Sequence, residues 1–78
     1  MISFELLPNT GSENPDTLEV YFDKAGLNSL IAQLRFINER RTDHVHLMAE
    51  SWGGNHLDEL TQVPNQIPIR HVKMILKE

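Results

Sequence analysis

Alternating hydrophobic and polar residues mark four short segments of the chain as strands with one apolar side. Residues 2–6 and 18–22 alternate in this way, and residues 45–49 and 72–76 repeat the pattern later in the chain. A period of two is typical of a strand whose two faces meet different surroundings. We therefore predict a sheet with one face in solvent, carrying Ser3, Glu5, Glu19, Tyr21, His44, His46, His71 and Lys73.

Between the second and third of these segments the apolar spacing becomes helical. From Lys24 to about Arg40 the apolar residues fall on a single stripe, which predicts an amphipathic helix; they are Leu27, Leu30, Ile31, Leu34 and Ile37. Phe36 lies outside this stripe, because at about 100° per residue it projects toward the solvent side. It is either folded over the helix flank or exposed as an aromatic anchor for a partner.

The predicted order of elements is therefore β-β-α-β-β. We expect an α+β two-layer sandwich in which one helix packs on a mainly antiparallel four-stranded sheet. The 78 residues form one domain, 1–78, because a chain of this length supports only one core. The stretch from Pro8 to Asp16 has the composition of a hairpin loop. The stretch from Ser51 to Gln66 is long for so short a chain, which is typical of a functional or mobile loop.

Charge and composition narrow the function. Seven Lys and Arg stand against eleven Asp and Glu, for a formal charge of −4, which disfavours direct binding to nucleic acid. The chain has no cysteine, so disulfides and thiolate metal sites are excluded. No secretory leader or membrane span is recognisable, and we expect a cytoplasmic protein. No cofactor motif is present either, since Gly53-Gly54 lacks a phosphate-binding pattern.

Three histidines are the residues most suggestive of chemistry. His44 and His46 lie on the same side of one predicted strand, and His71 on another strand could complete a three-nitrogen zinc site. An open sheet face offers no closed cavity, however. We therefore interpret the three as the polar side of two strands and expect no catalytic residue. A small metal-dependent or acid/base enzyme that uses them is the alternative.

Trp52 lies directly before the two glycines, in the loop that follows the histidine strand. A large amphipathic ring in such a loop is either a lid over the core edge or an interface anchor. Asp58 and Glu59 follow in the same loop and are suited to the charged rim of an interface. Our candidate partner-binding residues are therefore Trp52, Phe36, Asp58 and Glu59.

Several of these segments together resemble the immunity protein 32 family of bacterial polymorphic toxin systems. They are Asp43–Met48, Ser51-Trp52-Gly53-Gly54, Leu57 and Ile69–Met74. The resemblance covers the C-terminal half, while the N-terminal half agrees only in length, pattern and predicted elements. It implies a small cytoplasmic α+β protein, encoded beside a toxin, that binds and neutralises the toxin domain without catalysis. A homodimer formed through an open sheet edge is a further alternative.

Overall fold

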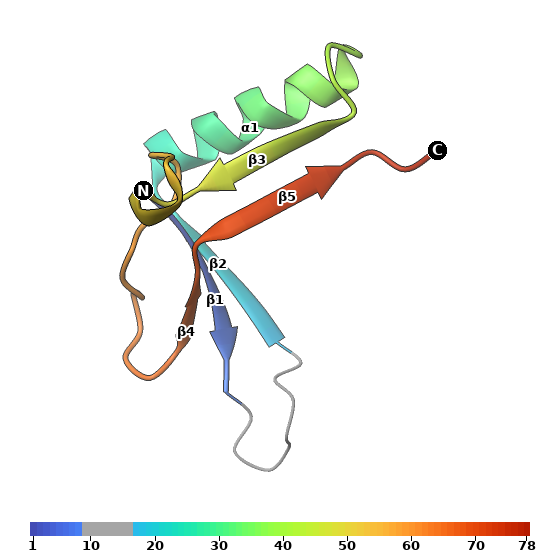
Figure 1. The fold of residues 1–78 in the computed structure, drawn as a ribbon. Helices are drawn as coiled ribbons and strands as arrows, with labels where there is room; N and C mark the ends of the chain where they lie inside the picture. The colour runs from blue at the N-terminus through green and yellow to red at the C-terminus, as the bar shows by residue number, and fades with distance from the viewer. Residues whose placement is uncertain (9–16) are drawn as a thin grey trace.

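The computed structural model describes residues 1–8 and 17–78 (Figure 1). The predicted hairpin loop, apart from Pro8, lies outside the described residues. The α+β class is confirmed. In chain order the elements are β1 (Ile2–Leu7), β2 (Thr17–Phe22), α1 (Lys24–Asn38), β3 (His44–Met48), the 3-10 turn η1 (Glu50–Trp52), β4 (Ile67–Ile69) and β5 (His71–Ile75).

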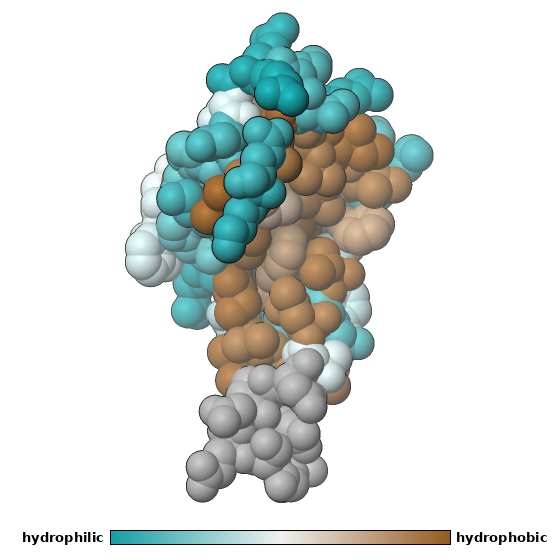
Figure 2. Space-filling view, turned by 90° about the vertical axis from the view of Figure 1, so that its right-hand side faces the viewer, coloured by the Kyte–Doolittle hydropathy of each residue, from teal (hydrophilic) through white to brown (hydrophobic). Residues whose placement is uncertain are grey.

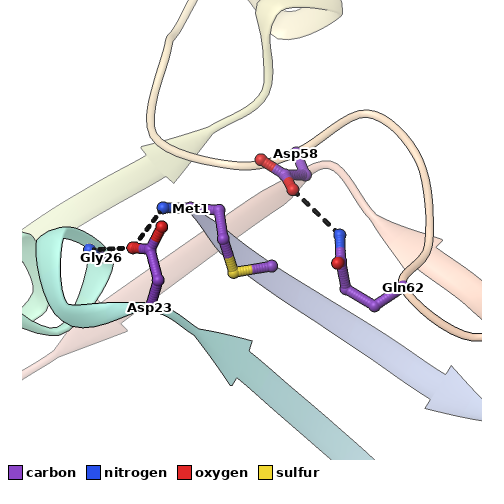
Figure 3. A network of polar contacts seen from close by, with 5 residues as sticks. All are labelled: Met1, Asp23, Gly26, Asp58 and Gln62. Carbon is purple, nitrogen blue, oxygen red and sulfur yellow. Dashed lines mark hydrogen bonds and ion pairs between the residues drawn. The ribbon is translucent and has the colours of Figure 1, made fainter.

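The helix begins where the sequence predicts. The Asp23 carboxylate accepts a hydrogen bond of 2.8 Å from the Gly26 backbone nitrogen, which satisfies one of the free amide groups of the first helical turn. The same carboxylate lies 2.6 Å from the Met1 amino group (Figure 3). Gly26 is buried against Met1, and a Cβ at this position would collide with the Met1 carbonyl oxygen. In the described part of the chain no helix has the length and apolarity needed to cross a membrane.

The strands form two sheets, so the predicted single four-stranded sheet is wrong. β1 lies between β2 and β4 in an antiparallel three-stranded sheet, and β3 pairs antiparallel with β5. Only Arg70 separates β4 from β5, and the chain changes sheets at this residue (Figure 1). The pattern did not predict β4, because it has only three residues and contains Pro68. Proline is tolerated there because β4 is an edge strand.

The core lies where the N-terminal end of β1 meets β3. Its buried members are Ile2, Leu47, Ala49 and Leu57. Phe4, Leu30, Val72 and Met74 pack against them and are themselves partly buried. The helix runs alongside β3 and also contacts β2, while the rest of the three-stranded sheet extends away from it (Figure 1). Much of the three-stranded sheet is therefore left without a helix.

The polar side of the three-stranded sheet is buried near β1. The prediction that Ser3 and Glu5 face solvent is therefore wrong. Their exposed fractions are 1% and 0%. The loop between η1 and β4 lies over them, since the backbone nitrogens of Gln62 and Val63 donate hydrogen bonds to the Glu5 carboxylate. The alternating pattern distinguished the two faces of β1 correctly. It could not show that a loop would cover the polar one.

Candidate functional site

The outer face of β3 and β5 carries the three histidines. In the antiparallel register His46 is opposite Lys73, and Met48 is opposite His71. The buried residues Val45 and Leu47 point to the other side. We call His44, His46, His71 and Lys73 the histidine face. Its members are partly buried or exposed, as predicted for the polar side of two strands.

Two of the histidines are directly coupled. His46 Nδ1 lies 2.8 Å from His71 Nε2, and the two rings stack with centroids 5.1 Å apart. One ring must donate and the other accept, so this bond requires at least one neutral imidazole. Burial lowers the pKa of His46, and electrostatic interactions with His71, His44 and Lys73 lower it further. These effects favour the neutral form of the His46 ring.

The third histidine has a different arrangement. The His44 ring stands edge-on to His46 with centroids 5.2 Å apart, and its Nδ1 lies 2.7 Å from an Asp43 carboxylate oxygen. This hydrogen bond lowers the pKa of Asp43. Among the residues that the structure describes, no group of three or more His, Cys, Asp or Glu side chains is arranged to hold a metal ion. The geometry thus lends no support to the alternative of a zinc site at His44, His46 and His71.

Trp52 extends the histidine face outward. Its side chain is 60% exposed, and its ring lies tilted against His71 with centroids 5.4 Å apart. The turn η1 that carries it ends at Gly53, whose φ of 86° is in the left-handed region that glycine adopts freely. The neighbouring Gly54 packs so closely on Met48 that a Cβ would collide with the Met48 backbone. Both glycines therefore fix the position of the tryptophan.

Glu59 links the turn η1 to Arg70, the residue between β4 and β5. It accepts hydrogen bonds from Ser51, at 2.6 Å from the backbone nitrogen and 3.1 Å from the hydroxyl, and one of 3.3 Å from Arg70 Nε. The backbone bond from Ser51, aided by the other two, lowers the pKa of Glu59. Glu59 was predicted as a charged rim residue, and the structure shows that it also holds η1 in place. Asp58, the other predicted rim residue, also has a partner within the chain: its carboxylate accepts a 3.1 Å hydrogen bond from the Gln62 side chain (Figure 3).

Phe36 is not brought to this surface. Its side chain is exposed near the C-terminal end of α1, with the Arg41 guanidinium 5.8 Å from the ring centre. The segment that follows η1 lies at the opposite end of the helix, where Asn55 and His56 line a pocket together with Ala25 and Gly26. At 1.5 Å per residue these two ends are about 18 Å apart. The four candidate residues therefore do not form one patch.

A second surface was missed by the sequence interpretation. On the side of the three-stranded sheet opposite Glu5, every residue is apolar; we call this surface the apolar face, and its members are Ile2, Phe4, Leu6, Leu18, Val20, Phe22, Ile67 and Ile69. Leu18 is 51% exposed, and Phe22 and Ile67 are each 47% exposed. Figure 2 shows hydrophobic surface extending from this sheet toward the helix. Alternation along β1 and β2 predicts an apolar side that the helix covers. Ile67 and Ile69 lie in β4, which the pattern did not predict.

Comparisons with known proteins add no relative. No protein-family model matches the chain, and neither the curated proteins nor the solved structures contain a match. The resemblance to the immunity protein 32 family stays a prediction that rests on the residues quoted for it.

Proposed function

We propose that this chain is a protein-binding domain that recognises its partner through the histidine face and Trp52. Following the resemblance, the partner is a toxin domain that the chain neutralises as an immunity protein in the cytoplasm. The observation that carries the proposal is the contact between Trp52 and His71. It joins two of the segments of the resemblance, Ser51–Gly54 and Ile69–Met74, on one exposed surface.

The arrangement of Trp52 suits an interface anchor. Tryptophan is among the residues that contribute most to binding energy when they become buried at the centre of an interface. Here the ring is exposed but held in place, through Ser51 and Glu59 on one side and His71 on the other. An anchor that is ordered before binding loses less conformational entropy in the complex. Glu59, which is hydrogen-bonded to the neighbouring Ser51, would supply an acidic group at the rim.

The net charge agrees with a basic partner. A chain of charge −4 attracts a positively charged protein at long range and increases its rate of association. This attraction is screened by salt, whereas the burial of Trp52 is not. We therefore expect the association rate to fall with ionic strength while the dissociation rate depends mainly on Trp52.

The test is co-expression with the toxin domain encoded by the neighbouring gene. We expect the wild-type chain to restore growth and to form a complex, and Trp52→Ala to weaken that complex by at least about 30-fold. Leu34→Ala is the matched control, because Leu34 is a similarly exposed apolar side chain, at 50%, and belongs to the helix α1 instead of the histidine face. Absence of both complex and rescue would remove the proposal. A Trp52→Ala complex as tight as the wild type would show that the binding surface is elsewhere.

A further inference from the structure

The apolar face is a hydrophobic surface that the described part of the chain leaves partly uncovered. Its eight positions include no polar or charged residue, and its β2 and β4 members are exposed or half-buried. Beside the sheet, Leu34 of the helix and Leu76 after β5 are 50% and 42% exposed. These two side chains line a groove of about 260 Å³ together with Ile37 and the polar residues Asn38, Arg40 and Glu78. Exposed hydrophobic side chains are thus present on the sheet, on the helix and on the C-terminal segment.

The size of this surface is close to that of a protein interface. Half-exposed aliphatic and aromatic side chains each leave roughly 60–100 Å² accessible. The four most exposed members of the face are Leu18, Val20, Phe22 and Ile67. Together with Leu34 and Leu76 they therefore present on the order of 500 Å² of apolar area. The largest apolar patch on a typical monomer is about 300–600 Å² and is often functional. A standard interface covers about 800 Å² per partner, including its polar rim. The apolar face with its surroundings is large enough to form such an interface.

We propose that the apolar face packs against the same face of a second copy of this chain, forming a two-fold symmetric dimer. Its composition favours this occupant, because permanent homodimer interfaces resemble a domain core cut in half. Two chains of net charge −4 repel each other at long range, but an interface without ionisable groups brings no like charges into contact. A basic toxin domain would find no acidic group on this face.

The geometry of the strands also suits self-association. Two sheets pack face to face about 10 Å apart with their strands about 30° from parallel, so that aliphatic side chains of the two inner faces interdigitate. A two-fold axis through the face would place Leu18, Val20 and Ile67 of one copy against the same set in the other. In the dimer the three-stranded sheet would be covered on both sides. This arrangement differs from the edge-to-edge dimer considered from the sequence.

The dimer is independent of the proposed toxin binding, since the two use different surfaces. Trp52→Ala should therefore leave the dimer intact, and a variant of the apolar face should still bind the toxin domain. Failure of one proposal is distinguishable from failure of the other, because each has its own variant and its own measurement.

Sedimentation of the purified full chain tests the dimer. From about 1 μM to about 500 μM we expect a concentration-dependent shift from one to two chain masses. Leu18→Glu should raise the dimer dissociation constant by at least about 100-fold, because it places an unpaired carboxylate in an apolar interface. Leu60→Glu, which makes the same change in an exposed loop, should leave the constant unchanged. A wild-type chain that stays monomeric over the whole range would overturn the proposal, as would an equal loss in both variants.

A measurement on the wild-type chain tests the same interface even if Leu18→Glu fails to fold. In a mixture of isotope-labelled and unlabelled wild-type chains, filtered nuclear Overhauser spectra report only contacts between copies. We expect such contacts for the methyl groups of Leu18 and Val20. Intermolecular contacts confined to other residues would show a dimer formed elsewhere and would contradict the assignment of this face.

Discussion

In the sheet of β3 and β5 the apolar residues Val45 and Leu47 are buried and the histidines face outward. In the sheet of β1, β2 and β4 the side that carries Ser3 and Glu5 is buried, and on the apolar side Ile2 belongs to the core while Leu18 and Phe22 are about half exposed. Both sheets have one apolar and one polar side. They differ in how much of each side the rest of the chain covers.

The difference has a physical cause in what each sheet meets. The side of β3 with Val45 and Leu47 faces the apolar stripe of α1, so burial there is hydrophobic. The polar side of β1 meets the loop before β4, whose backbone nitrogens at Gln62 and Val63 need acceptors, and Glu5 supplies them. A polar side can therefore be buried when hydrogen bonds satisfy it. The apolar side that this leaves open is the candidate dimer interface.

The largest effect should come from the hydrophobic core. Leu47→Ala removes a fully buried side chain and should cost about 3 kcal/mol of unfolding free energy, measured by urea denaturation. Leu18→Ala makes the same change on the open apolar face and should cost less than about 1 kcal/mol at low protein concentration, where association contributes least. If Leu47→Ala and Leu18→Ala lost the same unfolding free energy, Leu18 would be as well buried as Leu47, and the comparison of the two sheets would be wrong.

The second-largest loss of unfolding free energy should come from the buried polar side of β1. Glu5→Ala leaves the backbone N–H groups of Gln62 and Val63 without their acceptor and should cost about 2 kcal/mol. Glu50→Ala, at an exposed glutamate of η1, serves as the control and should change stability by less than about 0.5 kcal/mol. A Glu5→Ala protein as stable as the control would contradict the burial of the polar side.

Acid should weaken the same contacts. Burial alone would raise the pKa of Glu5, but the hydrogen bonds from Gln62, Ser3 and Val63 outweigh it and lower the pKa below 4.5. Because the folded state binds the proton less tightly than the unfolded state, the carboxylate stabilises the fold above about pH 4.5, and this contribution is lost as the pH falls through the folded pKa. The stability difference between wild type and Glu5→Gln should therefore shrink between about pH 5 and pH 3. A difference that is constant over this range would contradict the assignment.

The smallest effect concerns the histidine face. Since the pKa of His46 lies below 6.5 in the folded protein, the wild type should lose a little stability as the pH falls below 6.5 through that pKa, and none between pH 7 and 8. Titration of the His46 ring signals by NMR gives this pKa directly. Lys73→Gln removes one of the positive charges and should raise it. A His46 pKa at or above 6.5 in the wild type would show that the ring is neither desolvated nor coupled to His71.

Much of the fold could be predicted from the sequence, for identifiable reasons. The helix from Lys24 and the strands around Phe4, Val20, Val45 and Val72 follow local periodicity, which the structure retains. The division into two sheets and the short strand β4 depend on contacts between distant residues. Three residues with a central proline, Ile67–Ile69, carry too little periodicity to be recognised.

The candidate site was predicted in part. The histidine face follows from alternation along β3 and β5, and an exposed Trp52 was one of two alternatives for a ring in a glycine-containing loop. The contact of Trp52 with His71, and the role of Glu59 in holding η1, depend on how the loop folds back. The apolar face required knowing that the loop, and not the helix, covers the other side of β1. Spacing along the chain does not contain that information.

The burial of the polar side of β1 is the central claim, and amide hydrogen exchange at Gln62 and Val63 tests it most directly. If Glu5 accepts hydrogen bonds from both residues beneath the loop, their amides exchange at least about 100-fold more slowly than in an unstructured chain, and Glu5→Gln makes them faster. Exchange of both amides at the unstructured rate in the wild-type protein would contradict the account.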